Sequence, residues 1–335
     1  MIEVGIIGAG RIGKVHGESI FTRVPNAHVK TIADPFMNED TEKWAAAHGI
    51  SNTTKDYHDI LNDPEIKAVL ICSSTDTHSP ISVDAIKAGK HVFCEKPIDH
   101  DLDKIQNVID ALKDSNVKYQ VGFNRRFDHN FKAVKDAADA GKIGETQMIT
   151  IQSRDPEPPP AEYVAVSGGI FLDMMIHDFD MARFLAGCEP VEIYAEGAVL
   201  VDPAIGEAGD VDTALVTMRM ENGALVSISN SRKAVYGYDQ QAEVFGSKGA
   251  VKCGNDCASQ AVLSTEDGII SEKPLFFFLE RYMDAYGDEI RQFIDAVEND
   301  TEVPVNVVDG LEAVRMGLAA TKSLKEHRPV KMSEI

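Results

Sequence analysis

Residues 2–13 read IEVGIIGAGRIG. The first six residues are typical of a buried strand, and the remainder form a G-x-G-x-x-G pattern at Gly8, Gly10 and Gly13. Helically spaced apolar residues follow as far as Phe21, so the stretch predicts a strand, a glycine turn and a helix. In such a turn the first glycine permits a tight bend, the second lets a pyrophosphate approach, and the third lets helix and strand pack closely. The helix N-terminus adds backbone N–H donors for the anion.

An aspartate at the end of the next apolar run strengthens this interpretation. Residues 28–33 have strand character and end at Asp34, close to the spacing of about 20 residues expected in a dinucleotide-binding unit. A carboxylate there accepts hydrogen bonds from the adenosine ribose and repels a 2′-phosphate, which favours NAD over NADP. The simpler alternative is a structural turn plus a surface aspartate. It leaves the agreement of the strand, the glycine turn with its helix, and the spacing of Asp34 to coincidence.

Strands and helices alternate as far as residue 122. Helices are expected at 11–21, 38–48, 57–61, 80–88 and 102–113, and strands at 2–7, 28–33, 68–72, 91–95 and 119–122. Such alternation predicts a doubly wound, parallel Rossmann sheet with helices on both faces. Ligands bind outside the carboxyl ends of strands in these sheets, which is where Glu95-Lys96-Pro97 and the polar turn 73–78 fall.

Residues 123–335 have a different pattern. Residues 146–153 and several runs between 190 and 252 look like strands of an antiparallel or mixed sheet, with a hairpin turn at 221–223. Further helices are expected at 130–140, 279–298 and 308–326. The predicted fold is α/β: an NAD-binding Rossmann domain at 1–122, and a substrate-binding and oligomerisation α+β domain with a large open sheet at 123–335. The pattern is also compatible with C-terminal helices that pack against the first domain.

Composition excludes several classes of protein. The formal net charge is −21, from 33 basic and 54 acidic residues, and a field of that sign disfavours nucleic acid and anionic membrane surfaces. No apolar run has the length of a membrane span, and the N-terminus lacks signal-peptide features. Five cysteines, an odd number in a long chain, favour a reducing, cytoplasmic location. Cys253 and Cys257 have no second ligand pair nearby, so no metal site is predicted.

Asp173 and His177 are candidates for acid–base chemistry. They open an expected helix, where residues four apart share a face. A neighbouring carboxylate orients the imidazole and makes it a general base able to take a proton from a hydroxyl. Taken alone, the pair is more often a surface pair, a helix cap or half of a metal site. Lys96 taken alone is equally compatible with a solvated lysine.

The motifs Gly8–Gly13, Glu95-Lys96-Pro97 and Asp173-x-x-x-His177, in this order, resemble those of the oxidoreductase family that includes glucose-fructose oxidoreductase and inositol dehydrogenase. The resemblance covers the whole chain. Residues 122–128, 153–156, 173–178 and 234–239 are similar to the inositol 2-dehydrogenase branch. A Rossmann domain and an α/β domain whose open sheet forms a homotetramer are implied, together with NAD-linked oxidation of a cyclitol hydroxyl to a ketone.

The resemblance also implies residue roles. His177, oriented by Asp173, would remove the hydroxyl proton while Lys96 stabilises the alkoxide and hydride passes to the nicotinamide. The expected cofactor contacts are Gly8, Gly10, Arg11, Ile12, Gly13, Asp34, Ser73, Ser74, Thr75, His78, Glu95, Lys96 and Arg125. The expected substrate contacts, for a small-molecule polyol, are Lys96, Asn124, Arg125, Asp155, Asp173, His177 and Tyr236.

Several of these roles have alternatives. Glu95 either holds the Lys96 ammonium or contacts the cofactor, and His78 is otherwise a helix-start residue without a ligand. Arg125 or Arg126, but not both, is expected in the pocket, because paired arginines also serve as structural anchors. Alternative functions are a dehydrogenase of glucose, a sugar acid or another sugar, and a non-catalytic NAD-binding regulatory protein. The inositol isomer, the tolerance of NADP and the isomer of the Lys96–Pro97 bond stay open.

Overall fold

The computed structural model describes residues 1–335, and the chain divides into two compact units. The first unit consists of Met1–Phe127 and Met283–Val314, and the second of Asp128–Tyr282 and Arg315–Ile335. A late segment of the chain therefore belongs to the first unit. The predicted assignment of nucleotide binding to 1–122 and of substrate binding to 123–335 concerns function and stays a prediction.

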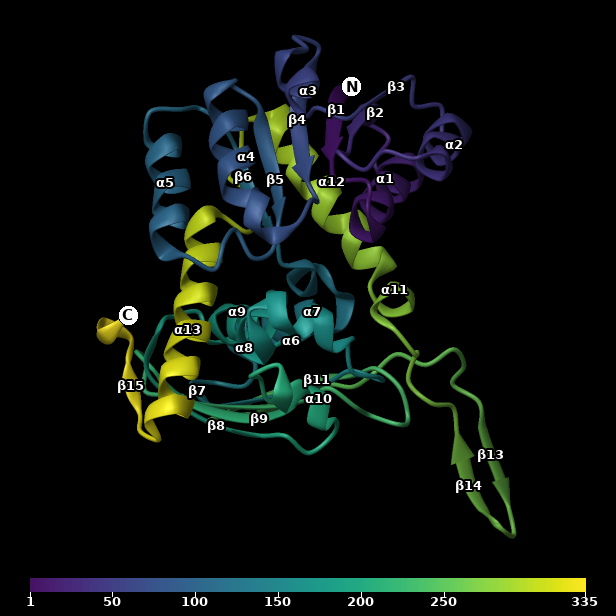
Figure 1. The fold of residues 1–335 in the computed structure, drawn as a ribbon. Helices are drawn as coiled ribbons and strands as arrows, with labels where there is room; N and C mark the ends of the chain where they lie inside the picture. Colours follow the sequence, from purple (N-terminus) through teal and green to yellow (C-terminus); the bar gives the residue numbers. More distant parts are fainter. The chain divides into compact units, whose positions relative to one another are not determined.

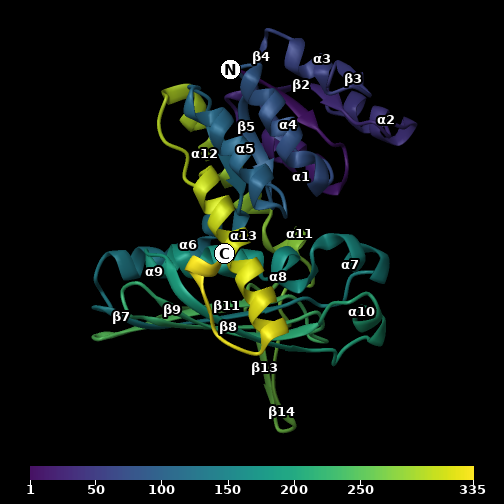
Figure 2. The same cartoon turned by 60° about the vertical axis from the view of Figure 1, so that its left-hand side comes forward.

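The first unit is built on a parallel sheet of six strands (Figures 1 and 2). The strands are β1 (Ile2–Ile7), β2 (Ala27–Ala33), β3 (Asn52–Thr54), β4 (Ile66–Ile71), β5 (His91–Glu95) and β6 (Tyr119–Gly122). Their order is β3-β2-β1-β4-β5-β6, and every pair is parallel. The chain runs from β1 outward through β2 to β3, and it then crosses back to β4 on the other side of β1 and continues outward through β5 to β6. Right-handed crossovers then place the connecting helices on opposite faces, which confirms the predicted Rossmann fold.

Helices of the first unit lie close to the predicted ranges, with two exceptions: the start of the helix expected at 80–88, and the single helix expected at 279–298, which the structure breaks at Tyr282. The helices are α1 (Arg11–Arg23), α2 (Glu39–Ala47), α3 (His58–Asn62), α4 (Thr75–Lys87), α5 (Leu102–Lys113) and α12 (Met283–Asn299), with a 3-10 turn at Asn124–Phe127. The start predicted for α4 was wrong. The helix was expected to begin at Pro80, but Ser74 occupies the N-cap position and Pro80 lies inside the helix.

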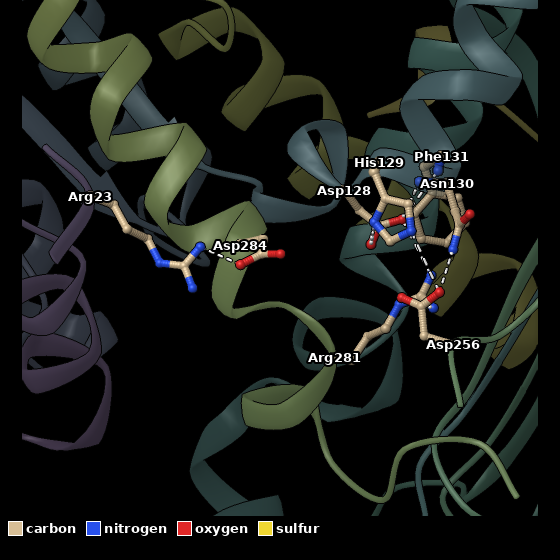
Figure 3. A network of polar contacts seen from close by, with 8 residues as sticks. All are labelled: Arg23, Asp128, His129, Asn130, Phe131, Asp256, Arg281 and Asp284. Carbon is tan, nitrogen blue, oxygen red and sulfur yellow. Dashed lines mark hydrogen bonds and ion pairs between the residues drawn. The ribbon is translucent and has the colours of Figure 1, made fainter. Parts of the chain in front are cut away.

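Helix α12 completes the core of the first unit. Its side chains Ile290, Phe293 and Ile294 are fully buried and join the cluster that contains the β1 residues Val4 and Ile6. Burial of each such side chain contributes about 1.5–3 kcal/mol, so these contacts alone hold α12 against the sheet. An ion pair between Arg23 of α1 and Asp284 of α12 lies on the surface beside them (Figure 3).

The second unit contains a seven-stranded mixed sheet. Its strands are β7 (Thr146–Arg154), β8 (Pro190–Ala198), β9 (Thr213–Met220), β10 (Leu225–Ser231), β11 (Asp239–Gly246), β12 (Gly249–Cys253) and β15 (Val330–Lys331). The order is β12-β11-β7-β10-β9-β8-β15, and only the central pair β7 and β10 is parallel. The predicted turn at 221–223 does join β9 to β10, with Gly223 at a φ of +86°.

Helices cover one face of this sheet and leave the other open (Figures 1 and 2). The helices of this unit are α6 (His129–Asp139), α7 (Ala161–Ser167), α8 (Gly169–Asp173), α9 (Ile176–Ala186), α10 (Pro203–Glu207) and α11 (Phe278–Arg281). Of these, α6 packs on β11 and β12 and α9 packs on β7. The last long helix, α13 (Val307–Glu326), begins in residues of the first unit and ends in residues of the second. Strand β9 alternates strictly, with Val216 buried and Leu215 exposed, as expected for a sheet with one solvent-facing side.

A two-stranded hairpin, β13 (Val262–Thr265) and β14 (Gly268–Ser271), extends away from the seven-stranded sheet (Figures 1 and 2). All eight strand residues are exposed. Elsewhere in the chain, none of the helices combines the length and apolar character that a bilayer crossing requires.

Candidate active site

The glycine turn has the geometry that nucleotide binding requires. Gly8 has a φ of +100°, and a Cβ there would lie 2.5 Å from the backbone of Cys72. A Cβ on Gly13 would lie 2.0 Å from the Gly8 carbonyl oxygen, so helix and turn pack together without room for a side chain. A Cβ on Gly10, in contrast, would meet no atom within 4 Å. The turn therefore presents bare backbone to open space at Gly10, as a bound pyrophosphate needs.

Asp34 lies at the carboxyl end of β2 beside this turn. Its two carboxylate oxygens accept hydrogen bonds from the backbone N–H groups of Ala9, at 2.7 Å, and Phe36, at 2.8 Å. The carboxylate is thus held in place by the turn itself. A fixed acid at this point of the sheet is what recognition of ribose hydroxyls calls for. Arg11 and Ile12, in the first turn of α1, are exposed and half-buried respectively.

Ser73, Ser74 and Thr75 lie where β4 gives way to α4, and none of the three is buried. His78 of the same helix is buried, and its ring nitrogens lie 2.8 Å from the Pro97 carbonyl oxygen and 3.0 Å from the Ser73 carbonyl oxygen. Burial by itself lowers the pKa of His78, but Cys94 and these two carbonyls outweigh it and raise the pKa to about 9. His78 therefore ties the Ser73 turn to Pro97.

Glu95 ends β5, and Lys96 and Pro97 follow it with a cis peptide bond between them. The Glu95 side chain points into the unit: it is 8% exposed and its Oε1 lies 2.7 Å from Nε2 of His16. Its other oxygen accepts a hydrogen bond from the Lys96 backbone N–H at 3.2 Å. Lys96 itself is half-buried. Sequence reasoning did not find His16 as the partner of Glu95.

The two arginines after β6 differ in their surroundings. Arg126 is half-buried and donates to Asp309 of α13 at 2.9 Å. This ion pair is the structural anchoring that was expected for one of the two arginines. Asn124 and Arg125 are 3% and 4% exposed. The first unit thus brings the predicted cofactor residues together at the carboxyl ends of β1, β2, β4, β5 and β6.

In the second unit, the strand register brings the predicted substrate residues to one end of the sheet. Ser231 of β10 pairs with Arg154 of β7, and Asp239 of β11 pairs with Arg154 from the other side. Asp155, which follows β7, and Tyr236, which precedes β11, therefore both belong to this end. Tyr236 donates to Asp239 at 2.5 Å and accepts from Arg154 at 2.9 Å. Burial and the bond to Asp239 raise the pKa of the Tyr236 hydroxyl.

The prediction of one helix through Asp173 and His177 was wrong. Asp173 ends α8, and a turn at Met174 and Met175 precedes α9, which begins at Ile176. The break follows from the backbone, because the N–H groups of Met174 and Met175 both bond to the Ile170 carbonyl. The relative orientation of the Asp173 and His177 side chains is therefore not that of two residues four apart on one continuous helix.

Asp173 has partners that the sequence did not reveal. Its Oδ1 accepts from the Tyr163 hydroxyl and its Oδ2 from the Arg232 guanidinium, both at 2.9 Å. Arg232 is buried and also lies 3.9 Å from Asp155, so one cation serves two predicted substrate residues. Burial and the Asp173 carboxylate raise the pKa of the Tyr163 hydroxyl.

Asp178 fixes the helix turn that carries His177. It is fully buried, and its carboxylate accepts from Ser153 at 2.5 Å and from Asn230 at 2.9 Å. Ser153 and Asn230 lie on β7 and β10, the parallel pair. The start of α9 is therefore bonded to the two central strands, and half-buried His177 is carried on a rigid element.

A second group of ionisable residues in this unit is structural (Figure 3). Asp128 caps α6 by accepting from the backbone N–H groups of Asn130 and Phe131. The Arg281 guanidinium lies 3.3 Å from Asp128 and 2.8 Å from Asp256. Together with His129 these acids have the composition of a metal site, but the guanidinium supplies the positive charge that a cation would bring.

The strand order and the glycine turn define a class, the dinucleotide-binding proteins of the Rossmann type. A family model described as "Oxidoreductase family, NAD-binding Rossmann fold" matches residues 2–123, and one described as "GFO/IDH/MocA C-terminal domain" matches residues 131–252. The chain belongs to this GFO/IDH/MocA family of oxidoreductases. It is an enzyme whose cofactor is NAD, and the open space at Gly10 and the fixed Asp34 carboxylate fit that cofactor.

Curated relatives match along the whole chain. The chain is 48% identical to a protein named myo-inositol 2-dehydrogenase from Thermotoga maritima, covering 100% of this chain and 99% of the relative. It is 45% identical to one named inositol 2-dehydrogenase from Rhizobium meliloti, covering 99% of each. A solved structure of scyllo-inositol dehydrogenase from Lactobacillus casei, with bound NAD(H) and scyllo-inositol, has a TM-score of 0.91 at 30% identity and covers 99% of each chain.

Proposed function

We propose that this enzyme oxidises one ring hydroxyl of an inositol, either myo- or scyllo-inositol, to the corresponding ketone with NAD. Similarity over the full chain to enzymes named inositol 2-dehydrogenase carries this proposal. The residues of the second unit are consistent with it. An uncharged polyol is recognised by several hydrogen bonds, and Asp155, Asp173, His177 and Tyr236 supply donors and acceptors from one unit.

In this proposal the chain binds the cofactor through the glycine turn and Asp34. Bound NAD supplies the hydride acceptor. The backbone at Gly10 holds the pyrophosphate, and Asp34 holds the adenosine ribose. Ser73, Ser74, Thr75, Arg125 and the Glu95–Lys96 segment are the remaining cofactor residues of the proposal. For His78, whose ring nitrogens lie against two carbonyls, we propose that it acts by shaping the turn at Ser73.

Proton chemistry is assigned to three side chains. His177 takes the proton from the reacting hydroxyl, and Asp173, held by Tyr163 and Arg232, orients it. Lys96 places its ammonium where the alkoxide charge develops, which is where a fixed charge lowers the barrier most. Asn124, Arg125, Asp155 and Tyr236 are proposed to hold the remaining hydroxyls of the ring.

Substrate class is tested by following NAD reduction spectrophotometrically with myo-inositol, scyllo-inositol, chiro-inositol, glucose and xylose. Turnover is expected with at least one inositol at a kcat/KM well above that for the two sugars. A preference for glucose or xylose would indicate a dehydrogenase of another sugar. Absence of turnover with all five, together with retained NAD binding, would favour a regulatory protein.

The residue roles are tested by two substitutions with matched controls. Lys96→Met and His177→Gln are each expected to lower kcat by about 10²–10⁴-fold, the usual contribution of such groups, while NAD still binds in a calorimetric titration. Lys113→Met and His58→Gln change exposed residues of the same types and should leave kcat unchanged. Near-normal turnover of either site variant would remove its assigned role.

Assembly and location complete the proposal. We infer a homotetramer whose subunits meet through the open face of the seven-stranded sheet, because that face carries the exposed apolar residues Met148, Leu215, Leu225 and Phe245. A reducing, cytoplasmic location is supported by the five cysteines, all of which are free thiols.

A further inference from the structure

Three ionisable side chains meet inside the first unit, and one of them, Glu95, directly precedes Lys96 in the chain. They are His16 of α1, Glu95 at the end of β5 and Glu289 of α12. Their exposed fractions are 0%, 8% and 0%, and one nitrogen or oxygen of each lies within 4.8 Å of the others. Two carboxyl groups that have lost their contact with water this completely need either positive charge or protons to balance them.

The two carboxyl groups have unequal surroundings. Glu95 has His16 Nε2 at 2.7 Å from one oxygen and accepts from the Lys96 backbone N–H at the other. Both side-chain oxygens of Glu289 are buried without a hydrogen-bond partner, although its backbone carbonyl accepts from Gln120. The donors therefore stabilise a negative charge on Glu95, and nothing comparable stabilises one on Glu289.

Other groups around the cluster do not alter this difference between Glu95 and Glu289. The rings of Phe93 and Tyr286 lie edge-on to the His16 imidazole at 5.0 and 5.6 Å. The Cys72 thiol is nearby, and its pKa is raised by burial, followed by the charge of Glu95. Burial, followed by the charge of Glu95, likewise raises the pKa of Glu289 well above the usual carboxyl value. No lysine or arginine side chain is recorded in contact with the Glu289 carboxyl.

We propose that His16 and Glu289 are positioning residues for Lys96: His16 holds the Glu95 carboxylate, and Glu289 is buried as a neutral acid, so that Glu95, the residue before Lys96, carries the single negative charge of the cluster. The segment that carries Lys96 is then fixed from inside by the bond from His16 to Glu95. The inference rests on the proposed role of Lys96 for its consequence in turnover, whereas the protonation of Glu289 does not depend on that role.

A divalent cation is the competing explanation, since one imidazole and two carboxylates are common ligands. Two ligand atoms bound to the same zinc at about 2.0–2.1 Å lie roughly 3.3 Å apart in tetrahedral geometry. His16 and Glu95 instead approach to 2.7 Å, which is the length of a charge-assisted hydrogen bond. The geometry therefore places a proton, and not a metal ion, between these two atoms.

The neutral state of Glu289 is tested by comparing unfolding of the wild-type enzyme and Glu289→Gln in denaturant across a range of pH. Above the usual carboxyl pKa the unfolded chain releases a proton that folded Glu289 keeps, so wild-type stability falls as pH rises until the folded pKa is passed. Gln has no such proton. The folding equilibrium constant of the variant relative to wild type should therefore rise by up to about tenfold per pH unit.

Glu298→Gln is the matched control, because Glu298 is an exposed carboxylate on the same helix. It should show no comparable pH dependence relative to wild type. A flat ratio for Glu289→Gln would overturn the proposal. A measurement on the wild-type enzyme keeps the test valid if the variant does not fold: the infrared band of a protonated carboxyl group should be present at neutral pH, and its absence would overturn the assignment.

The positioning role of His16 is tested by His16→Gln and His16→Phe. Gln retains a donor that reaches Glu95, whereas Phe fills the space without one, so kcat should fall by up to about 100-fold for Phe and be largely restored for Gln. Equal losses in both variants would overturn the role.

Metal analysis of the purified wild-type enzyme and Glu289→Gln addresses the cation. Absence of stoichiometric metal is expected, and a stoichiometric ion lost in the variant would overturn the proton assignment. If Lys96→Met keeps its turnover, the proposed role of Lys96 fails, but the pH dependence of Glu289 is unaffected, so the two failures are distinguishable.

Discussion

At the scale of single residues, Asp34 has an observed structural task beside its proposed role in cofactor recognition. Its carboxylate is anchored by backbone N–H groups on both sides, one from the glycine turn and one from its own loop. The charge is therefore fixed at the end of β2, where the adenosine ribose is expected. A fixed negative charge repels a 2′-phosphate more effectively than a mobile one, because it is unable to turn away from the phosphate.

Replacing Asp34 should change cofactor preference. For Asp34→Ala we expect the ratio of kcat/KM with NAD to kcat/KM with NADP to fall at least about tenfold, equivalent to about 1.4 kcal/mol. Asp34→Asn keeps an acceptor for the Ala9 N–H and should shift preference with less loss of NAD affinity. Asp56→Ala, at an exposed position, is the control. An unchanged ratio in both Asp34 variants would place the ribose contact elsewhere.

At the scale of elements, the three glycines of the first turn do different work. Gly13 is required by packing, since its missing side chain makes room for the Gly8 carbonyl. Gly10 is free of such contacts and has a φ of −70°, which any residue adopts. Nothing in the protein itself makes a glycine necessary there. We therefore expect the motif to combine a folding requirement at Gly13 with a binding requirement at Gly10, which substitution can separate.

Gly13→Ala should destabilise the apo enzyme by about 1–3 kcal/mol, because the new methyl group forces turn and helix apart. Gly10→Ala should leave the apo melting temperature unchanged and weaken NAD binding at least about tenfold, because its methyl group occupies the space that the pyrophosphate needs. Thermal unfolding without cofactor and calorimetric titration with NAD measure the two effects. Wild-type NAD affinity in Gly10→Ala would move the pyrophosphate away from this turn.

Local elements were predictable where the chain carries local signals. Helix α5 and strand β6 match the expected ranges residue for residue. Asp101 caps the helix, and the strand is a short segment that ends at Gly122. The break between α8 and α9 was missed because it depends on which carbonyl the Met174 and Met175 N–H groups select. Packing determines which carbonyl these N–H groups bond to, and the hydrophobic periodicity of the sequence does not show it.

Long-range partners in the candidate site were missed for a related reason. Asp34, Asp173 and His177 could be proposed from the sequence because their chemistry and spacing are visible there, and their roles stay predictions. Arg232 and Glu289 are an ordinary arginine and glutamate until folding buries them beside other charges. Helix α12 joins the first unit through contacts nearly 300 residues distant in sequence, and no local pattern reports those.

At the scale of the whole molecule, the open face of the seven-stranded sheet carries large apolar side chains that are exposed to solvent. Its apolar residues come from several strands, including Leu215 of β9 and Leu225 of β10, which are 60% and 50% exposed. Contiguous apolar surface of this kind marks an interaction site. A chain of net charge −21 repels its copies at long range, so association has to come from short-range apolar contact.

If the proposed tetramer forms through this face, Leu215→Lys should shift it to smaller species, because a buried, unpaired ammonium is costly at an interface. Light scattering coupled to size-exclusion chromatography measures the change. Leu200→Lys is the control, since Leu200 is 74% exposed but lies outside the sheet. A tetramer that persists in the Leu215 variant would place the subunit contact on another surface.

Hydrogen exchange in the hairpin β13–β14 can report whether the hairpin is covered by another protein surface. Its strands pair only with each other, and every residue in them faces solvent. An isolated two-stranded hairpin is marginally stable in water, so its amide hydrogens should exchange with deuterium quickly in a free subunit, while those of β7 and β10 exchange slowly. Any surface that covers the hairpin, including another copy of the chain, would slow that exchange, so the exchange rate of the hairpin amides would detect it.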